Sequence, residues 1–436
     1  MALLLKNCHA IDPQASLNDT VDILVSDGKI AEVGKGLEAP DAEVRDMAGK
    51  VVVPGLVDIH VHLREPGQEY KEDIETGTRA AAHGGMTAVC CMPNTNPTID
   101  NGSVVEYVRA RARDAGKCRV YVSGACTKGL KGEILSEMGD MVAHGAVAFT
   151  DDGRGVQSAG MMRRVMDYAT QFGKTVMSHC QDEALVDKGQ VNEGAVSTKL
   201  GLLGWPSTGE EIQIQRDIEI SRLTGCPIHI QHLTTGHAVE IVRRGKADGV
   251  KVTCEVTPHH MFLSEDDITD AYNTNMKVNP PLRTKADNQA VIQGVVDGTV
   301  DCIVTDHAPH ADFEKDREFE EAPFGMTGIE TSLGLMLTHL VNPGVISWER
   351  MVELMAVNPR KILNVDPVSL QAGSVADLTV IDPQLEWTVS ADDFESKAKN
   401  CGFLGAHLTG RATDVYVSGY PTLLDGTIVE EPIHLG

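Results

Sequence analysis

The chain has 436 residues, of which 42% are hydrophobic and 23% charged, a balance typical of soluble globular proteins. Its formal net charge of −25 argues against a nucleic-acid partner, which requires a basic surface. No apolar run reaches the roughly 20 residues of a membrane helix, and the opening MALLLKNCHAIDP is too soon interrupted for a signal peptide. We therefore expect a cytoplasmic protein without a membrane or nucleic-acid partner.

The two ends of the chain share one character. The first 50 residues contain short strand-like runs and a hairpin signal, VDILVSDGKIAEVG, in which Asp27 and Gly28 suit a tight turn. From about residue 366 onward, AGSVADLTVIDP and DVYVSGYPTLLDGTIV repeat this pattern. We predict a small β-sandwich domain formed by both termini, residues 1–53 plus 366–436.

Between these ends, residues 54–365 show a regular rhythm of strand and helix signals. Short β-branched runs alternate with longer helix-compatible segments that end near glycine. The runs are 51–62, 87–94, 119–127, 146–152, 175–180, 227–233, 251–259 and 301–310. Eight such runs predict an α/β protein with a (β/α)₈ TIM-like barrel. A doubly wound open sheet is the alternative, but no G-x-G-x-x-G follows the first run.

Polar residues gather where the predicted strands end, which is where such barrels place their active sites. His60 and His62 end the first run, in PGLVDIHVHLREPG, and as residues i and i+2 they share one face. Other runs end in Asp151 and Asp152, in His179, in His232, and in Asp306 followed by His307 and His310. Each residue alone would be ordinary, but together at one barrel mouth they predict a metal site.

Because side chains alternate along a strand, neighbouring candidates for metal ligands point to opposite faces, and only one of each pair can point into the barrel. Asp152 has the inward parity of its strand, so we expect it to be a ligand and Asp151 to be a solvated or capping residue. If residues 228, 230 and 232 point inward, His229 has the wrong parity and is expected to face a helix.

The predicted ligands suit hydrolytic chemistry. Four histidines and a bridging carboxylate can hold two zinc ions roughly 3.5–4 Å apart and lower the pKa of bound water toward about 7. We expect Zn²⁺, one or two ions per subunit with two favoured, bridged by Asp152 and hydroxide. Asp306, a carboxylate on the same rim, suits the role of general acid and base.

These residues resemble a known family over nearly the whole chain. The chain resembles the dihydroorotases of the amidohydrolase superfamily, in the bacterial type I branch. The motifs that carry the resemblance are PGLVDIHVHLREPG, CMPNTNP, FTDDG, SHCQD, HIQHLTT, EVTPHH, VNPPLR, TDHAPH and APFGMTGIET. The arginine after H-x-H together with TDHAPH is the most specific part, whereas AGSVADLTVID marks only the wider superfamily.

The resemblance implies roles for individual residues. It places the metal ligands at His60, His62, Asp152, His179, His232 and Asp306, and makes Asp306 also the catalytic acid and base. It implies substrate contacts at His62, Arg64, Asn94, Asn279, His310, Phe324 and Gly325, the last two through the backbone. The implied reaction is the reversible cyclisation of N-carbamoyl-L-aspartate to L-dihydroorotate in pyrimidine (UMP) synthesis. The family is also compatible with a homodimer and with association with aspartate transcarbamoylase.

Two other functions remain open at this point. A hydantoinase, dihydropyrimidinase or allantoinase would generally carry a carboxylated lysine near the fourth strand, but no lysine lies between Lys131 and Lys174. Arg64 also fits a ring that bears a carboxylate better than an uncharged hydantoin. A non-catalytic scaffold for aspartate transcarbamoylase would have lost ligands, whereas here every ligand position is filled. The charged segment 311–323 is expected to be either a solvated loop or a lid over the site.

Overall fold

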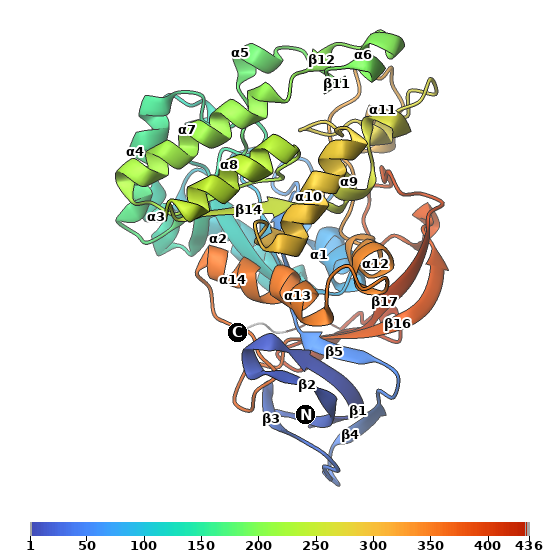
Figure 1. Cartoon of the computed structure of the whole chain (residues 1–436). Helices are drawn as coiled ribbons and strands as arrows, with labels where there is room; N and C mark the ends of the chain where they lie inside the picture. The colour runs from blue at the N-terminus through green and yellow to red at the C-terminus, as the bar shows by residue number, and fades with distance from the viewer. Residues whose placement is uncertain (1, 432, 434–436) are drawn as a thin grey trace.

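The centre of the protein is a parallel barrel (Figure 1), seen in a computed structural model that describes residues 2–431 and 433. Its eight strands follow one another around the barrel in chain order: β6 (Leu56–Val61), β7 (Met86–Cys91), β8 (Arg119–Gly124), β9 (Ala146–Phe149), β10 (Thr175–Ser178), β13 (Ile228–Ile230), β14 (Val252–Val256) and β15 (Cys302–Ile303). The ring closes where Val61 pairs in parallel with His307 and the backbone N–H of His62 donates to the carbonyl of His307 at 2.9 Å. The predicted (β/α)₈ barrel is confirmed.

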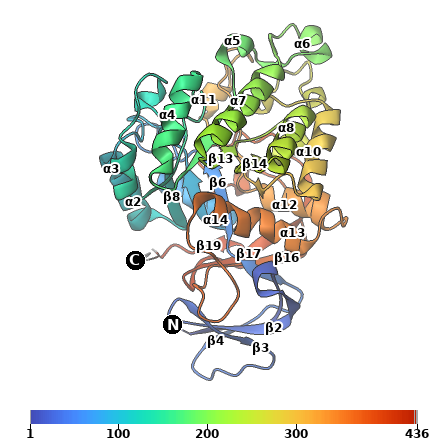
Figure 2. The ribbon, with the colours of Figure 1, turned by 60° about the vertical axis from the view of Figure 1, so that its left-hand side comes forward.

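Helices cover the outer face of the barrel and extend above its mouth (Figures 1 and 2). The α-helices are α1 (Ile74–His83), α2 (Gly102–Ala115), α3 (Met138–Ala143), α4 (Ala159–Thr170), α5 (Glu183–Val186), α6 (Ala195–Leu200), α7 (Thr208–Thr224), α8 (Gly236–Ala247), α9 (Pro258–Phe262), α10 (Lys285–Asp297), α11 (Asp312–Lys315), α12 (Ser332–Met336), α13 (Trp348–Val352) and α14 (Asn358–Leu363). Shorter 3₁₀ or π turns are η1 (Pro13–Ala15), η2 (Lys128–Leu130), η3 (Glu265–Asp267), η4 (Thr274–Met276), η5 (Leu337–Val341), η6 (Glu353–Val357) and η7 (Ala391–Asp393). A two-stranded pair lies outside the barrel, β11 (Val191–Asn192) with β12 (Gly204–Trp205).

Both ends of the chain contribute to a second, nine-stranded sheet below the barrel (Figure 2). Its strands are β1 (Leu3–Asp12), β2 (Leu17–Ser26), β3 (Lys29–Gly34), β4 (Glu43–Asp46), β5 (Val51–Pro54), β16 (Leu378–Thr388), β17 (His407–Val417), β18 (Tyr420–Leu424) and β19 (Thr427–Ile428). The predicted hairpin joins β2 to β3, with Asp27 and Gly28 at φ of 51° and 76° as a tight primed turn requires. A β-domain built from both termini is confirmed, and the boundaries 1–53 plus 366–436 and 54–365 stay a prediction.

The run 51–62 is not one strand, as the sequence suggested, but two. β5 pairs with β1 and β16 in the terminal sheet, whereas β6 pairs with β7 in the barrel. Gly55 joins them, and a Cβ atom there would lie 2.3 Å from Oγ1 of Thr87. Continuous apolar character hides this change of sheet, and the glycine is the one local sign of it.

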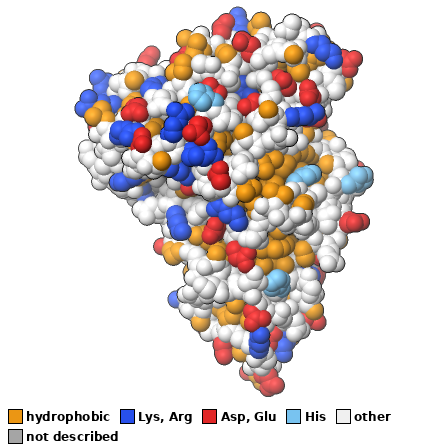
Figure 3. Space-filling view, viewed as in Figure 1, with side chains coloured by type: hydrophobic (Ala, Val, Ile, Leu, Met, Phe, Trp, Pro, Cys, Tyr) orange, Lys and Arg blue, Asp and Glu red, His pale blue; other side chains and the backbone are white. Residues whose placement is uncertain are grey.

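Two sets of buried side chains stabilise these layers. The larger set packs the outer faces of barrel strands, for example Phe149, Val176 and Ile228, against the helices. A separate cluster that includes Leu5 and Tyr416 lies within the terminal sheet. Acidic and basic side chains are mixed over the face seen in Figure 3, and hydrophobic ones gather near α12 and α13. No helix of residues 2–431 is both long and apolar enough to cross a membrane.

Candidate active site

The six predicted metal ligands meet at the carboxyl ends of the barrel strands. His60 lies in β6 and His62 follows it, while His179 comes directly after β10. Asp152, His232 and Asp306 lie two or three residues beyond β9, β13 and β15. All six side chains are buried, with at most 8% of any residue exposed. Residues distant in the sequence are therefore held by a rigid frame, as the strand-end argument expected.

Asp152 occupies the centre of this cluster. Its Oδ1 lies 3.3 Å from Nε2 of His60, 3.4 Å from Nδ1 of His179 and 3.7 Å from Nε2 of His232. Its Oδ2 lies 3.4 Å from Nε2 of His62. Asp152 thus belongs to two ligand triads, one with His60 and His62 and one with His179 and His232, each with donor atoms within 4.8 Å of one another.

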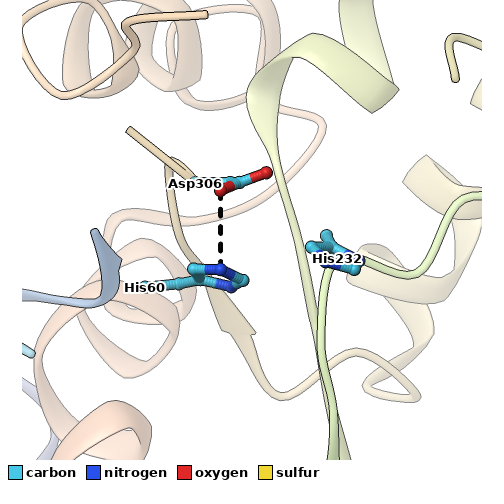
Figure 4. Close-up of side chains that lie close together, drawn as sticks. All are labelled: His60, His232 and Asp306. Carbon is cyan, nitrogen blue, oxygen red and sulfur yellow. Dashed lines mark ion pairs between the residues drawn. The ribbon is translucent and has the colours of Figure 1, made fainter. Parts of the chain in front are cut away.

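Asp306 completes a third triad, with His60 and His232 (Figure 4). Its Oδ1 lies 3.5 Å from Nε2 of His60 and 3.0 Å from Nε2 of His62. The carboxylate predicted to carry protons is therefore placed directly beside the predicted ligands.

The donor set fits a divalent metal. Two buried atoms at the centre of the cluster, Nε2 of His60 and Oδ1 of Asp152, have no hydrogen-bond partner within the described part of the chain. Leaving buried polar atoms unpaired costs about 1–3 kcal/mol each, so a cation between them would relieve that cost. Imidazole nitrogen and carboxylate oxygen are the donors that zinc prefers besides thiolate.

The charges of the cluster reinforce this arrangement. Burial alone would lower the pKa of His60, but the carboxylates of Glu255 and Asp152 raise it well above its usual value. Burial likewise opposes ionisation of Asp152, yet His60 and the other histidines hold the pKa of its carboxyl well below the usual value. The carboxylates therefore stay ionised, which is the form that binds a metal.

A cavity of about 200 Å³ opens directly onto the cluster. Its walls are His62, Arg64, Asn94, Asp152, Gly153, His179, His232, Asn279, Asp306, Ala308, His310, Phe324 and Gly325. All seven predicted substrate contacts line it, and so do five of the six predicted metal ligands. His60 is fully buried beside it. The structure brings the predicted residues together, while their individual roles stay predictions.

One end of the cavity is cationic. The Arg64 side chain is buried, donates from Nε to the Pro309 carbonyl at 3.1 Å, and places Nη2 3.5 Å from Nε2 of His310. His310 donates from Nε2 to the Phe324 carbonyl at 2.8 Å. Burial, and then the charges of Arg64 and Lys71, depress the pKa of His310 far below its usual value, so its ring is neutral. Arg64 remains as a fixed positive charge able to bind a carboxylate.

Three site residues have left-handed backbone, which is uncommon outside glycine: Arg64, His232 and Asp306, with φ of 61°, 31° and 45°. Such backbone concentrates at functional sites, where surrounding structure holds it in place. At His232 it breaks the alternation of β13 and turns the side chain toward the cluster.

Two orientations predicted from the sequence are wrong. His229 does not face a helix but points into the barrel, with Nε2 2.9 Å from Oε2 of Glu255, because Ile228 and Ile230 are the outward residues of β13. Of the two roles expected for Asp151, solvated or capping, the first is wrong: Asp151 is buried, and its side chain accepts a hydrogen bond from the backbone N–H of Thr127 at 3.0 Å, which ties two rim loops together. Burial raises the pKa of Asp151 to about 6.

Two residues at the site were not assigned from the sequence. Oε1 of Gln181 accepts hydrogen bonds from Nε2 of His179 at 3.1 Å and from Nδ2 of Asn279 at 2.7 Å, joining a predicted ligand to a predicted substrate contact. Glu255 lies against Nδ1 of His60. The available signals were the i+2 spacing from His179 in SHCQD and the single charged residue within the run VTCEV.

Comparison with known proteins shows the family of the chain. Residues 49–238 match the family model described as dihydro-orotase-like. A dihydroorotase of Acetivibrio thermocellus is 48% identical over 427 residues, covering 98% of each chain. A dihydroorotase of Pelobacter propionicus is 50% identical over 420 residues, covering 96% of this chain and 99% of that one. The chain belongs to the dihydroorotase family.

Solved structures show how far the fold of this dihydroorotase-family chain is shared. An L-hydantoinase (dihydropyrimidinase) from Arthrobacter aurescens superposes with a TM-score of 0.88 at 27% identity, covering 98% of this chain and 97% of that one. A D-hydantoinase (dihydropyrimidinase) from Thermus sp. gives a TM-score of 0.86 at 27% identity, with 99% and 97% covered. This chain therefore shares its fold with hydantoinases over nearly its whole length, so the fold does not distinguish between the substrates and the residues lining the cavity must do so.

Proposed function

We propose that this protein is a zinc-dependent dihydroorotase that interconverts N-carbamoyl-L-aspartate and L-dihydroorotate. Membership of the dihydroorotase family makes it a metal-dependent cyclic amidohydrolase acting on a small molecule. The observation that carries the choice of substrate is the pairing, within one cavity, of the ligand cluster with the buried guanidinium of Arg64. A ring that bears a carboxylate can place its amide at the cluster and its carboxylate against Arg64.

The ligand cluster would hold two zinc ions, because Asp152 is shared between the triad of His60 and His62 and that of His179 and His232. When bound there, zinc supplies Lewis acidity toward the ring carbonyl and makes water nucleophilic near neutral pH. His60, His62 and His179 keep their second nitrogens in hydrogen bonds; Nδ1 of His62, for example, lies 2.9 Å from Oδ1 of Asn94. These outer contacts fix the rings before substrate arrives.

Asp306 moves the proton. Its carboxylate lies at the cavity wall, so it can take a proton from the attacking water and return it to the departing ring nitrogen. In the direction of synthesis the same carboxylate takes the proton from the carbamoyl nitrogen that closes the ring. Burial opposes ionisation of Asp306, but the charge of His60 and then the contact with His62 lower the pKa of its carboxyl, which favours the ionised form that such a base requires.

Asn279 would supply a contact to the substrate ring from the cavity wall. Its Nδ2 donates to Gln181, which leaves its buried Oδ1 facing the cavity residues without a hydrogen-bond partner among residues 2–431. An unpaired buried acceptor favours a ligand that brings a donor, and a ring N–H of dihydroorotate is such a donor. The backbone at Phe324 and Gly325 closes the same side of the cavity.

The hydantoinase alternative is supported by the close match of overall structure. Against it stand the absence of a lysine between Lys131 and Lys174, the carboxylate of Asp152 in the bridging position, and Arg64 in the cavity. The scaffold alternative is opposed by a complete ligand set. A homodimer, association with aspartate transcarbamoylase and a cytoplasmic location stay predictions made from the sequence and the resemblance.

The function is tested by offering metal-replete protein L-dihydroorotate, hydantoin, dihydrouracil and allantoin, and following ring opening of each. Ring opening of dihydroorotate alone is the expected result. Efficient opening of the uncharged rings would contradict the role given to Arg64, and no reaction with any of the four would favour the scaffold.

A further inference from the structure

We propose that Glu255 is a positioning residue that orients two predicted metal ligands, His60 and His232. His229 contacts the other oxygen of the Glu255 carboxylate and holds that carboxylate in place. This inference rests on the proposed metal site but concerns residues that neither the sequence argument nor the family comparison assigned. Glu255 lies in β14 inside the barrel and is completely buried. A charged residue in that place requires an explanation, because burying an unpaired carboxylate is costly.

Both carboxylate oxygens of Glu255 are hydrogen-bonded. Its Oε1 lies 2.5 Å from Nδ1 of His60 and also accepts the backbone N–H of His232 at 3.2 Å. Its Oε2 lies 2.9 Å from Nε2 of His229. On the far side of that ring, Nδ1 of His229 lies 2.8 Å from the hydroxyl of Thr253. The result is a series of hydrogen-bonded side chains that runs from Thr253 through His229 and Glu255 to His60.

This chain fixes which nitrogen of His60 is free. An ionised carboxylate only accepts hydrogen bonds, so the proton of Nδ1 of His60 is directed at Glu255 and Nε2 is the nitrogen left to bind a metal. Nε2 is the atom that faces Asp152 and has no other partner within the described residues. Nε2 of Gln231 also lies 3.3 Å from Nδ1 of His60, but the shorter contact to a charged acceptor decides the tautomer.

Glu255 also connects the two triads. His60 belongs to the triad with His62, and His232 belongs to the triad with His179. Glu255 holds the first through its ring and the second through its backbone, at the residue whose left-handed φ of 31° turns its side chain inward. One carboxylate therefore fixes the positions of His60 and His232 relative to each other. Apolar side chains in its place could not hold these two residues by hydrogen bonds.

The test compares zinc affinity in full-length variants, measured by competition with a chromophoric chelator. Glu255→Gln keeps the size of the side chain but removes its charge, and its amide can donate a proton toward His60. We expect zinc affinity to fall by about 10–100-fold, the usual cost of losing such an outer partner. At saturating zinc, KM for dihydroorotate should be close to that of the wild type, because Glu255 does not line the cavity.

The matched control is Asp217→Asn. Asp217 is also a fully buried carboxylate, but it lies on α7 and accepts from the Ser178 hydroxyl at 2.6 Å and from Arg216 rather than from a predicted ligand. Loss of a buried charge should lower the thermal midpoint of both metal-free variants, whereas only Glu255→Gln should lose zinc affinity. Equal zinc affinity in Glu255→Gln and wild type would overturn the proposal.

A second variant covers a failure of Glu255→Gln to fold. His229→Gln retains a donor toward Glu255 while breaking the contact to Thr253, and we expect a loss of zinc affinity of about 3–10-fold, smaller than for the direct partner. Unchanged zinc affinity in His229→Gln would contradict the role of His229 in positioning Glu255. Ring opening of dihydroorotate by the wild type reports separately on the proposed function, so the two proposals can fail independently.

Discussion

Asp306 and His62 are in contact at the mouth of the barrel: Oδ1 of Asp306 lies 3.0 Å from Nε2 of His62, although 244 residues separate them. The contact exists because the first and last barrel strands meet where Val61 pairs with His307. Closure of the barrel therefore delivers the proposed proton carrier to the proposed metal ligands, and the fold itself assembles the reaction centre.

Replacing Asp306 with asparagine should remove catalysis while keeping the site assembled. The amide is close in size but cannot take up a proton, so kcat for dihydroorotate should fall by about 10²–10⁴-fold. Metal content should be measured on the same sample, because Asp306 is also a predicted ligand. A variant that retains both metal and near-normal kcat would contradict the role of Asp306.

Replacing Arg64 with methionine should weaken recognition of the substrate carboxylate. Loss of a charge-assisted contact of about 1.5–3 kcal/mol corresponds to a rise in KM of roughly 10–150-fold. Arg222→Met, at an exposed arginine paired with Asp248, is the control and should leave KM unchanged. If Arg64→Met alters dihydroorotate and hydantoin turnover equally, the carboxylate is recognised elsewhere.

Much of this architecture could be predicted from the sequence, because it depends on local patterns. The strand and helix rhythm gave the barrel, and the polar residues ending each strand, such as His179 and Asp306, gave the site. What alternation could not foresee was the left-handed backbone at His232, which reverses the parity on which the expectation for His229 depended. Partners across the barrel are equally invisible: Glu255 meets His60 across 195 residues of sequence.

Replacing Gln181 with leucine should affect metal binding and substrate binding together, because one oxygen serves both His179 and Asn279. We expect zinc affinity to fall by about 10-fold or more and KM for dihydroorotate to rise. Gln215→Leu is the matched control, since Gln215 is exposed and its side chain donates to Glu219 on the same helix. A change in KM with unaltered zinc affinity would separate the two functions and contradict the shared role.

Stability should depend on pH through Lys315, a buried lysine whose ammonium donates to the carbonyls of Thr274 and Pro323. Burial lowers its pKa to about 7, whereas the unfolded chain retains a value near 10.5. Between these values the unfolded state binds a proton that the folded state lacks, so folding becomes more favourable as pH rises. Relative to Lys315→Met, the wild-type free energy of unfolding should increase by up to about 1.4 kcal/mol per pH unit.

Urea unfolding at several pH values from neutral to alkaline checks this expectation. Lys285→Met is the control, because Lys285 is exposed and forms its ion pair with Asp266 at the surface. If the free energy of unfolding of the wild type, relative to that of Lys315→Met, stays constant or falls as pH rises, Lys315 keeps its proton in the folded state.

The most direct measurement is a zinc titration of the chelator-treated protein, with formation of dihydroorotate from N-carbamoyl-L-aspartate followed at each addition. We expect the metal-free protein to be inactive and the rate to rise until two equivalents of zinc are bound, with Asp152→Asn failing to reach that stoichiometry. Full activity without metal, or activity indifferent to Asp152, would contradict the two-zinc site on which the proposed function depends.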